Sequence, residues 1–335
     1  MLWYEGISGD IGVPGLGGPN SVAGGVNEFG LAMGNAETLS KDPNNENVCG
    51  YGTGLQCVVF LWQNGAITQL PTLGGVNAGW GSINNQGEVV GFAENKTRDP
   101  KCPSGVALNG TGPQVLDYEA VIWGPGEGQI RQLQPLHGDT VGVAYWINDK
   151  GQAVGMSGTC ANTLLPPVGT GAHAVLWENG AVTDLGNLGG TVNPAQLAIG
   201  NAAFAINDRG QVVGGSPVTS TTAHAFLWTW ETGMRDRGTL PGDIVSAGLG
   251  INNRDKVVGN SVSAPGPLMG NPRPFLWRDG VMVDLNTLIP ADSPLKLLTA
   301  SGINDRGQIT GSGVTSNGEI HAYLATPIVT LNYQP

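Results

Sequence analysis

The stretch "INDRGQVVG", residues 206–214, decides the fold, because the chain contains five further versions of it. These are "VNEFGLAMG" (26–34), "INNQGEVVG" (83–91), "INDKGQAVG" (147–155), "INNRDKVVG" (251–259) and "INDRGQITG" (303–311). A phrase that recurs along a chain marks a repeat architecture, in which each copy belongs to one supersecondary unit. The phrase itself predicts a tight turn that begins at Asn-Asp and ends at a glycine in the left-handed region. Asp255 takes the place of that glycine in the fifth copy, and Asp tolerates positive φ.

A second phrase, built around Phe-Leu-Trp, accompanies the first. Its copies are "FLWQNGAITQL" (60–70), "VIWGPGEGQIRQL" (121–133), "VLWENGAVTDLG" (175–186), "FLWTWETGMRDRG" (226–238) and "FLWRDGVMVDL" (275–285). The Asn-Gly and Asp-Gly pairs predict two-residue hairpin turns, in which both residues need positive φ. The apolar runs are continuous instead of alternating, which is typical of strands buried on both faces.

One unit is therefore predicted to be four short antiparallel strands, and the whole chain an all-β protein. The tryptophans at 62, 123, 177, 228 and 277 are 61, 54, 51 and 49 residues apart. Four-stranded units of this length are typical of a β-propeller. We expect a single propeller domain over 1–335, with six four-stranded blades closed by the N-terminal segment 2–12. The alternative is seven blades, with that segment starting a sheet of its own.

Composition excludes several classes of protein. The 335 residues carry a net charge of −11, which argues against a nucleic-acid partner because phosphate binding needs a basic patch. No apolar run reaches the roughly 20 residues of a membrane-spanning helix, so we expect no membrane insertion. The chain has no P-loop, no H-E-x-x-H and no G-x-S-x-G motif, and we expect no cofactor and no metal. The first residues lie inside a repeat, which suggests a longer natural precursor.

The two phrases together resemble the HAF repeat of bacterial extracellular proteins. "HAVLWENGAVTDLGNLGG" (173–190) followed by "AINDRGQVVGGS" (205–216) is nearly the whole signature, and the resemblance extends over essentially the full chain. It implies a secreted or cell-surface bacterial protein. It implies no particular reaction.

The loops differ between the two faces of the predicted ring. One face carries only tight turns, whereas the other carries the long connections 36–57, 92–118 and 157–172. Binding residues usually lie on loops held by a rigid scaffold, so we expect the site on the loop-rich face. Trp80, Tyr145 and Trp146 lie on inner strands of neighbouring units, where most units have small residues. They predict a stacking wall for a sugar or another flat ligand. The alternative is that they plug the channel or pack beneath the long loops.

Three polar residues on the predicted loop-rich face are further candidates for ligand binding. His137 and Asp139 lie in the loop "LHGDT", and Asp243 holds the corresponding place in the next unit. His137 stands outside the repeated histidine position, so it is a candidate for binding or for exchanging protons. The alternative is that it is an ordinary loop residue.

The four cysteines, Cys49, Cys57, Cys102 and Cys160, all lie in the three long connections. Four cysteines allow three pairings. Cys49 with Cys57 closes a short local loop and leaves Cys102 to pair with Cys160 between neighbouring units. A cysteine metal site is the alternative, but no close Cys-x-x-Cys spacing supports it. Disulfides predict an oxidising compartment.

These observations favour a secreted or cell-surface propeller that binds a carbohydrate, peptide or protein partner on its loop-rich face, without catalysis. One alternative is an extracellular hydrolase or lyase with its site on the same face. Another is a structural module that assembles a surface or matrix.

Overall fold

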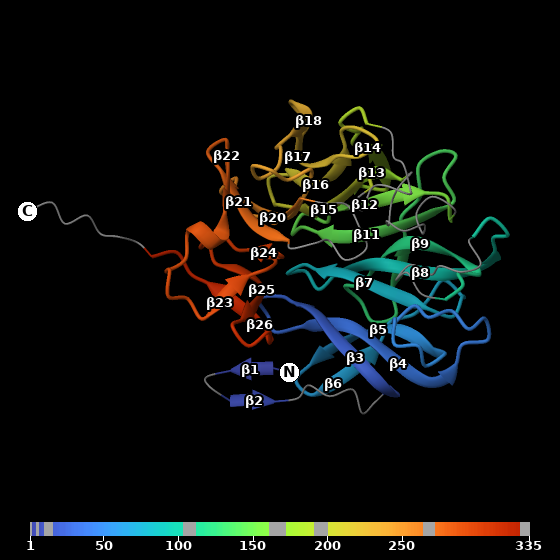
Figure 1. Ribbon diagram of the computed structural model, residues 1–335. Helices are drawn as coiled ribbons and strands as arrows, with labels where there is room; N and C mark the ends of the chain where they lie inside the picture. The colour runs from blue at the N-terminus through green and yellow to red at the C-terminus, as the bar shows by residue number, and fades with distance from the viewer. Residues whose placement is uncertain are drawn as a thin grey trace, which may run out of the picture.

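The computed structural model describes residues 2–4, 7–9, 16–102, 112–160, 172–190, 200–263 and 272–328. These residues form β-strands joined by turns, with one short 3₁₀ helix, η1 (Leu285–Thr287). The sheets follow one another around a central axis in chain order, from β3 in blue to β26 in red (Figure 1). The innermost strand of each sheet contacts the innermost strand of the next, which is a β-propeller arrangement.

Three sheets each contain four strands in simple sequential order. The first is β3 (Gly17–Val26), β4 (Ala32–Lys41), β5 (Leu55–Gln63) and β6 (Ala66–Gln69). The second is β7 (Ala78–Ile83), β8 (Val89–Arg98), β9 (Leu116–Trp123) and β10 (Ile130–Gln132). The third is β11 (Val141–Ile147), β12 (Ala153–Gly158), β13 (His173–Glu178) and β14 (Ala181–Asp184).

The next eight strands form one continuous sheet. Its first half is β15 (Ala202–Ile206), β16 (Val212–Pro217), β17 (Ala223–Thr229) and β18 (Gly233–Asp236). Its second half is β19 (Val245–Ile251), β20 (Val257–Val262), β21 (Arg273–Arg278) and β22 (Val281–Asp284). The halves are joined because Ala223 of β17 pairs in parallel with Val245 of β19.

The last sheet contains β23 (Leu295–Leu297), β24 (Gly302–Ile303), β25 (Ile309–Thr315) and β26 (Ile320–Ala325). Both β23 and β24 pair with β25, so together they occupy the position of one inner strand. The hydrogen-bonded sheets thus include four that are separate and four-stranded. The prediction of six separate four-stranded blades is wrong.

The predicted closure by residues 2–12 is also wrong for the described part of that segment. β1 (Leu2–Tyr4) and β2 (Ile7–Gly9) pair with each other from Leu2↔Gly9 to Tyr4↔Ile7. They form a two-stranded sheet of their own, because a hairpin satisfies its backbone groups locally. This is a separate sheet, as the seven-blade alternative supposed, but it has two strands and is not a full blade.

The turn predictions are confirmed. The hairpin pairs Asn64-Gly65, Asn179-Gly180 and Asp279-Gly280 all have positive φ, from 51° to 86°. Asp255 has φ 59°, close to the 75° of Gly210 at the same position in the preceding copy.

The core lies between neighbouring sheets. Middle strands such as β9, β12 and β16 are buried along their whole length, whereas the outer strands β6 and β10 are largely exposed. Trp123 packs with Val59 and Leu70 of the preceding unit, and Trp177 packs with Val90 and Ile122 of the unit before it. Each sheet therefore stabilises the next, as the two-sided apolar runs predict.

All six copies of the first phrase end in glycine, and at Gly214 the glycine is needed for close approach of two strands. A Cβ built on Gly214 would lie 2.0 Å from the carbonyl oxygen of Ala202 in β15. The neighbouring inner strand has a bulge between Ala203 and Ala205, which shifts its register against β16. Only glycine fits there without moving the backbone.

Candidate functional site

The asparagine of the repeated phrase links each unit to the next. Asn207 donates from Nδ2 to the backbone carbonyl of Asn252, at 3.0 Å. The same bond runs from Asn27 to Asn84, from Asn84 to Asn148, from Asn148 to Asn207 and from Asn252 to Asn304, at 2.9–3.1 Å. We call these six residues the asparagine ring. Among the described residues, no such bond from Asn304 to Asn27 closes it.

The rest of the phrase holds each asparagine in position. Asn207 Oδ1 accepts the backbone N–H groups of Arg209 and Gln211, both at 3.0 Å. Its Nδ2 also donates to Gln211 Oε1 at 2.7 Å. One side chain therefore stabilises its own turn and reaches the next unit, which explains why Ile-Asn and Gly-Gln recur together.

The residue after each asparagine forms a second chain of bonds between units. Asp208 Oδ1 accepts the backbone N–H of Asp149 at 3.0 Å, and Asn253 Oδ1 accepts that of Asp208 at 2.9 Å. The other bonds run from Glu28 N–H to Asn85, from Asn85 N–H to Asp149 and from Asn253 N–H to Asp305, at 2.7–3.0 Å. Two parallel ladders thus surround one end of the axis.

A cavity of about 530 Å³ opens at this end of the axis, and we call it the axial mouth. It is lined by the asparagine ring, by the isoleucine or valine before each asparagine, by the residue after each one, and by Trp146 and Arg306. Its volume lies in the range of ligand sites, roughly 300–1,000 Å³. Four of its residues carry carboxylates, Glu28, Asp149, Asp208 and Asp305, which we call the acidic ring.

The three predicted aromatic residues do not form one wall. Trp146 is 36% exposed and lines the axial mouth. Tyr145 sits at a bulge of β11 and packs against Phe204 and Met156, and its ring centroid lies 5.5 Å from that of Phe204. Burial raises the pKa of Tyr145. The backbone of Trp80, in β7, pairs with Gly91 of β8, but the side chain of Trp80 lies outside the described residues.

The three polar candidates lie in connections at the other end of the inner strands. His137 and Asp139 precede β11, whereas Trp146 lies near the end of that strand, roughly 20 Å away at ~3.3 Å per residue. Asp139 accepts a bond from Ser157 Oγ at 2.7 Å, and Asp243 binds Arg273 at 2.9 Å. Both carboxylates therefore support their loops, and His137 is exposed.

Two of the three repeated histidines pair with the carboxylate that recurs on the outer strand. His173 Nδ1 lies 3.1 Å from Asp184, and His224 Nδ1 lies 2.8 Å from Asp236. These cross-strand contacts explain why the two residue types recur at matching positions.

Both predicted disulfides are present. Cys49 bonds to Cys57, with Cα atoms 5.3 Å apart, and Cys102 bonds to Cys160, with Cα atoms 4.9 Å apart. The second ties the connection after β8 to the connection after β12, and Tyr145 packs against the apolar cluster that contains Cys160.

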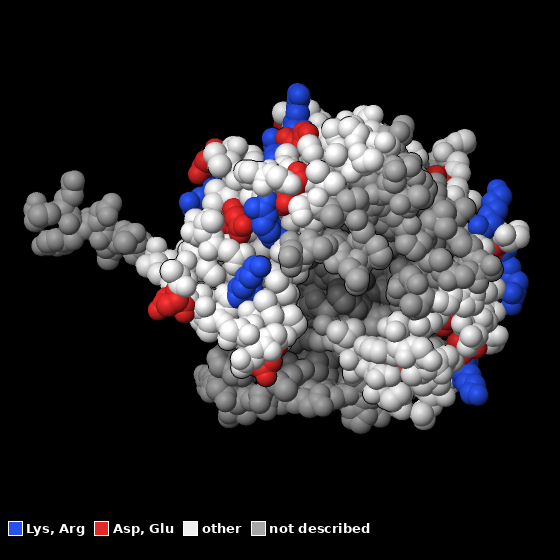
Figure 2. All heavy atoms as spheres, in the orientation of Figure 1, with Lys and Arg blue, Asp and Glu red and all other residues white. Residues whose placement is uncertain are grey.

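The predicted site on the loop-rich face stays a prediction, because residues 103–111, 161–171, 191–199 and 264–271 lie outside the described residues. In Figure 2 the face in view is hollowed near its middle, and most of the described Lys and Arg side chains lie toward the outer edge of that face.

A buried acidic network between the first and second sheets has no signature in the sequence. Glu46, Glu94 and Asp42 are all buried, and Gln114 Nε2 donates to both Glu46 Oε1 (3.2 Å) and Glu94 Oε1 (3.1 Å). Burial first, and then repulsion by Glu46, raise the pKa of Glu94 to about 8. Burial also raises the pKa of Glu46.

No helix among the described residues is long and apolar enough to cross a membrane. No protein-family model matches the chain, and no curated protein matches it. The resemblance to the HAF repeat therefore stays a prediction.

Solved structures with a similar arrangement have low identity. An acylaminoacyl peptidase from Pyrococcus horikoshii has 12% identity over 91% of this chain and 51% of its own, with a TM-score of 0.44. The β-propeller domain of the Trilobed protease from Pyrococcus furiosus has 10% identity over 91% of this chain and 95% of its own, with a TM-score of 0.38. A sialidase from Trypanosoma rangeli has 9% identity over 91% of this chain and 54% of its own, with a TM-score of 0.41. The chain thus spans about half the length of the peptidase and of the sialidase.

Proposed function

We propose that the protein is a secreted or cell-surface binding propeller whose axial mouth receives a positively charged side chain of a partner protein or peptide. The observation that supports this most is the acidic ring around a cavity that also contains the exposed Trp146. The loop-rich face predicted from the sequence is the alternative location for the partner.

The charge of the mouth favours a cation. Four carboxylates line it against one positive side chain, Arg306. A concave site lined by charges of one sign concentrates the field and attracts the opposite charge. The face of a tryptophan also attracts an ammonium or guanidinium group within about 6 Å of the ring centroid. A neutral sugar would use Trp146 for stacking but would gain nothing from the carboxylates' charge.

The residues of the mouth favour binding over catalysis. The described lining residues include no serine, cysteine or histidine, so they offer no nucleophile–base pair of the usual kind. Three of its four carboxylates already accept bonds from neighbouring units, as Asp149 Oδ2 does from Asn85 Nδ2 at 2.8 Å. A hydrolase or lyase site elsewhere on the ring is the competing function.

An oxidising compartment is the setting that we propose for this protein. Both disulfides support it, since such bonds persist outside the reducing cytosol. The HAF-like repeat implies the same location.

We also propose that the eight-stranded sheet acts as two blades, which gives six blades in all. Each half has its own four strands in sequential antiparallel order, and a single residue pair joins the halves. An apolar cluster containing Val213, Phe275 and Leu240 fills the space between them, as between the separate sheets.

Calorimetric titration of the full chain with a lysine-containing peptide tests the proposed binding. The variant Glu28→Gln/Asp305→Asn removes two charges, and amides already occupy this position at Asn85 and Asn253. We expect at least tenfold weaker binding by this variant and by Trp146→Ala. We also expect loss of binding when the peptide lysines are acetylated.

The matched control is Glu127→Gln/Asp292→Asn, which removes two charges from exposed carboxylates away from the mouth. It should bind like the wild type. Equal weakening by the control and by the mouth variant would show that only the overall charge matters, and it would contradict the proposal.

A further inference from the structure

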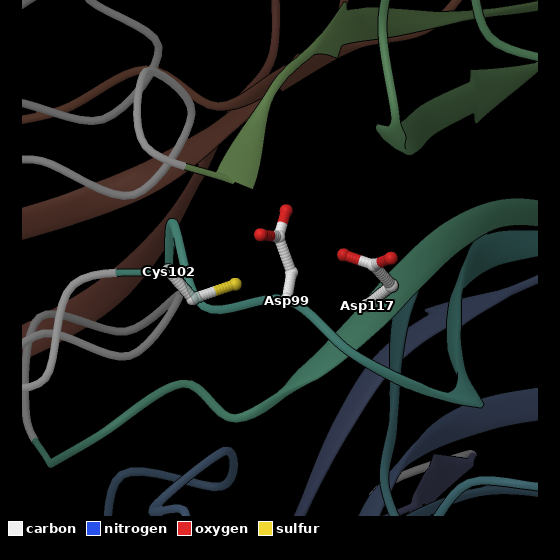
Figure 3. A group of neighbouring side chains, drawn as sticks. All are labelled: Asp99, Cys102 and Asp117. Atoms are coloured by element: carbon white, nitrogen blue, oxygen red, sulfur yellow. The ribbon is translucent and has the colours of Figure 1, made fainter.

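A second acidic site lies away from the axial mouth, beside the disulfide that links two connections. Asp99, in the connection after β8, and Asp117, on β9, extend their carboxylates toward a common space (Figure 3). A carboxylate oxygen of each, together with Cys102 Sγ, lies within 4.8 Å of the others. None of these residues lines the axial mouth.

Unpartnered oxygens in this region call for a ligand. Asp117 is only 8% exposed, and its Oδ1 is buried without a hydrogen-bond partner among the described residues. Glu119 follows two residues later, so it projects from the same face of the strand. It is 7% exposed, and its Oε2 is likewise buried without a partner. A buried carboxylate oxygen left unpaired is costly.

No positive side chain neutralises this group among the described residues. The ion pairs found there involve neither Asp99 nor Asp117 nor Glu119. Burial first, and then repulsion by Asp99, raise the pKa of Asp117 to about 6. Burial mainly raises the pKa of Glu119 to about 7, and Asp117 contributes by repulsion. The site thus lacks a counter-charge.

We propose that Asp99 and Asp117, with Glu119 beside them, bind a calcium ion. The donors are carboxylate oxygens, which hard divalent cations prefer. Cys102 is held in a disulfide with Cys160, so it offers no thiolate, and a zinc site is disfavoured. Asp99 is half-buried, so the ion reaches the site from solvent, and water completes its shell of 6–8 oxygens.

A bound ion would fix the connection after β8. Asp99 also caps its own turn, since its Oδ1 accepts the Lys101 N–H at 2.7 Å. The ion would join this turn to β9 within a few residues of the Cys102–Cys160 bridge. Calcium and the disulfide would then hold the same segment, the one non-covalently and the other covalently.

Calorimetric titration with calcium chloride, on the full chain first treated with a chelator, tests the site. We expect a dissociation constant of about 0.1–1 mM, the range of extracellular calcium modules. Asp117→Asn should weaken binding at least tenfold, and so should Asp99→Asn. Asp99 is less buried, so its variant gives the test if Asp117→Asn fails to fold.

Asp292→Asn, at an exposed carboxylate elsewhere, is the control and should bind calcium like the wild type. Terbium luminescence with calcium competition gives a second readout that does not depend on stability. Undetectable binding up to about 10 mM calcium, well above that range, would overturn the proposal in favour of a proton held between the two carboxylates. Equal binding by wild type and both variants would place the ion elsewhere and overturn it as well.

Discussion

Asn207 Nδ2 donates to the carbonyl oxygen of Asn252 at 3.0 Å, and this bond joins two units that lie 45 residues apart in the chain. The amide that makes this contact is oriented by Gln211 and stabilises its own turn. Removal of one side chain therefore affects two units at once.

Asn207→Ala should lower the free energy of unfolding by about 2–4 kcal/mol, because it leaves several backbone groups near the buried turn without partners. The matched control is Asn304→Ala at the end of the ladder. Asn304 stabilises its own turn, but no described bond leads from it to another unit. We expect the control to cost about half as much in urea denaturation. Equal costs would show that the bond between units contributes little.

Gly214→Ala tests the close approach of β15 and β16. A Cβ would lie 2.0 Å from the Ala202 carbonyl oxygen, which cannot move without the strand. We expect a loss of roughly 2 kcal/mol or more, in the range of severe overpacking. Gly25→Ala is the control, because its nearest neighbours would be ordinary contacts at 3.6 Å. A melting temperature of Gly214→Ala no lower than that of the control would contradict the geometry.

Glu94 should make the protein less stable as pH rises. Its pKa in the folded state is about 8, above the ordinary 4.5, so the folded state binds the proton more tightly than the unfolded chain. This stabilisation is present at pH below about 4.5 and is lost as pH rises through about 8, by at most about 1.4 kcal/mol per pH unit. Glu94→Gln should reduce this fall in urea midpoint between pH 5 and pH 8. The exposed Asp292→Asn should keep the wild-type slope, and an unchanged slope in Glu94→Gln would contradict the assignment.

The two disulfides should differ in their contribution to stability. The bonded residues are 58 apart for Cys102–Cys160 and 8 apart for Cys49–Cys57. The loop-closure relation gives about 4 kcal/mol for the longer loop and about 2.5 kcal/mol for the shorter one. Replacing each pair by serines should therefore lower the melting temperature more for Cys102 with Cys160. The opposite order would show that native packing outweighs chain entropy here.

Local sequence chemistry predicted the turns and the strands well. Asn64-Gly65 and Asp255 adopt positive φ because their own backbone preferences decide it, and the cysteine pairing followed from the few combinations that four cysteines allow. The number of separate sheets could not be predicted, because it depends on one contact, Ala223 with Val245.

The candidate site was predicted less well, because it depends on how units meet. Tyr145 and Trp146 are adjacent in sequence, but Tyr145 packs against Phe204 whereas Trp146 lines the axial mouth. The loops of the face with tight turns are short, so their length gives no indication of a binding site there. The asparagine present in all six copies is the available signal for the ladder, but formation of the turn accounts for its recurrence equally well.

A crystal structure of the full chain with a lysine-containing peptide tests the proposed function most directly. We expect the peptide ammonium in the axial mouth, within about 6 Å of the Trp146 ring centroid and beside the acidic ring. A peptide bound on the loop-rich face, with the mouth empty, would contradict it.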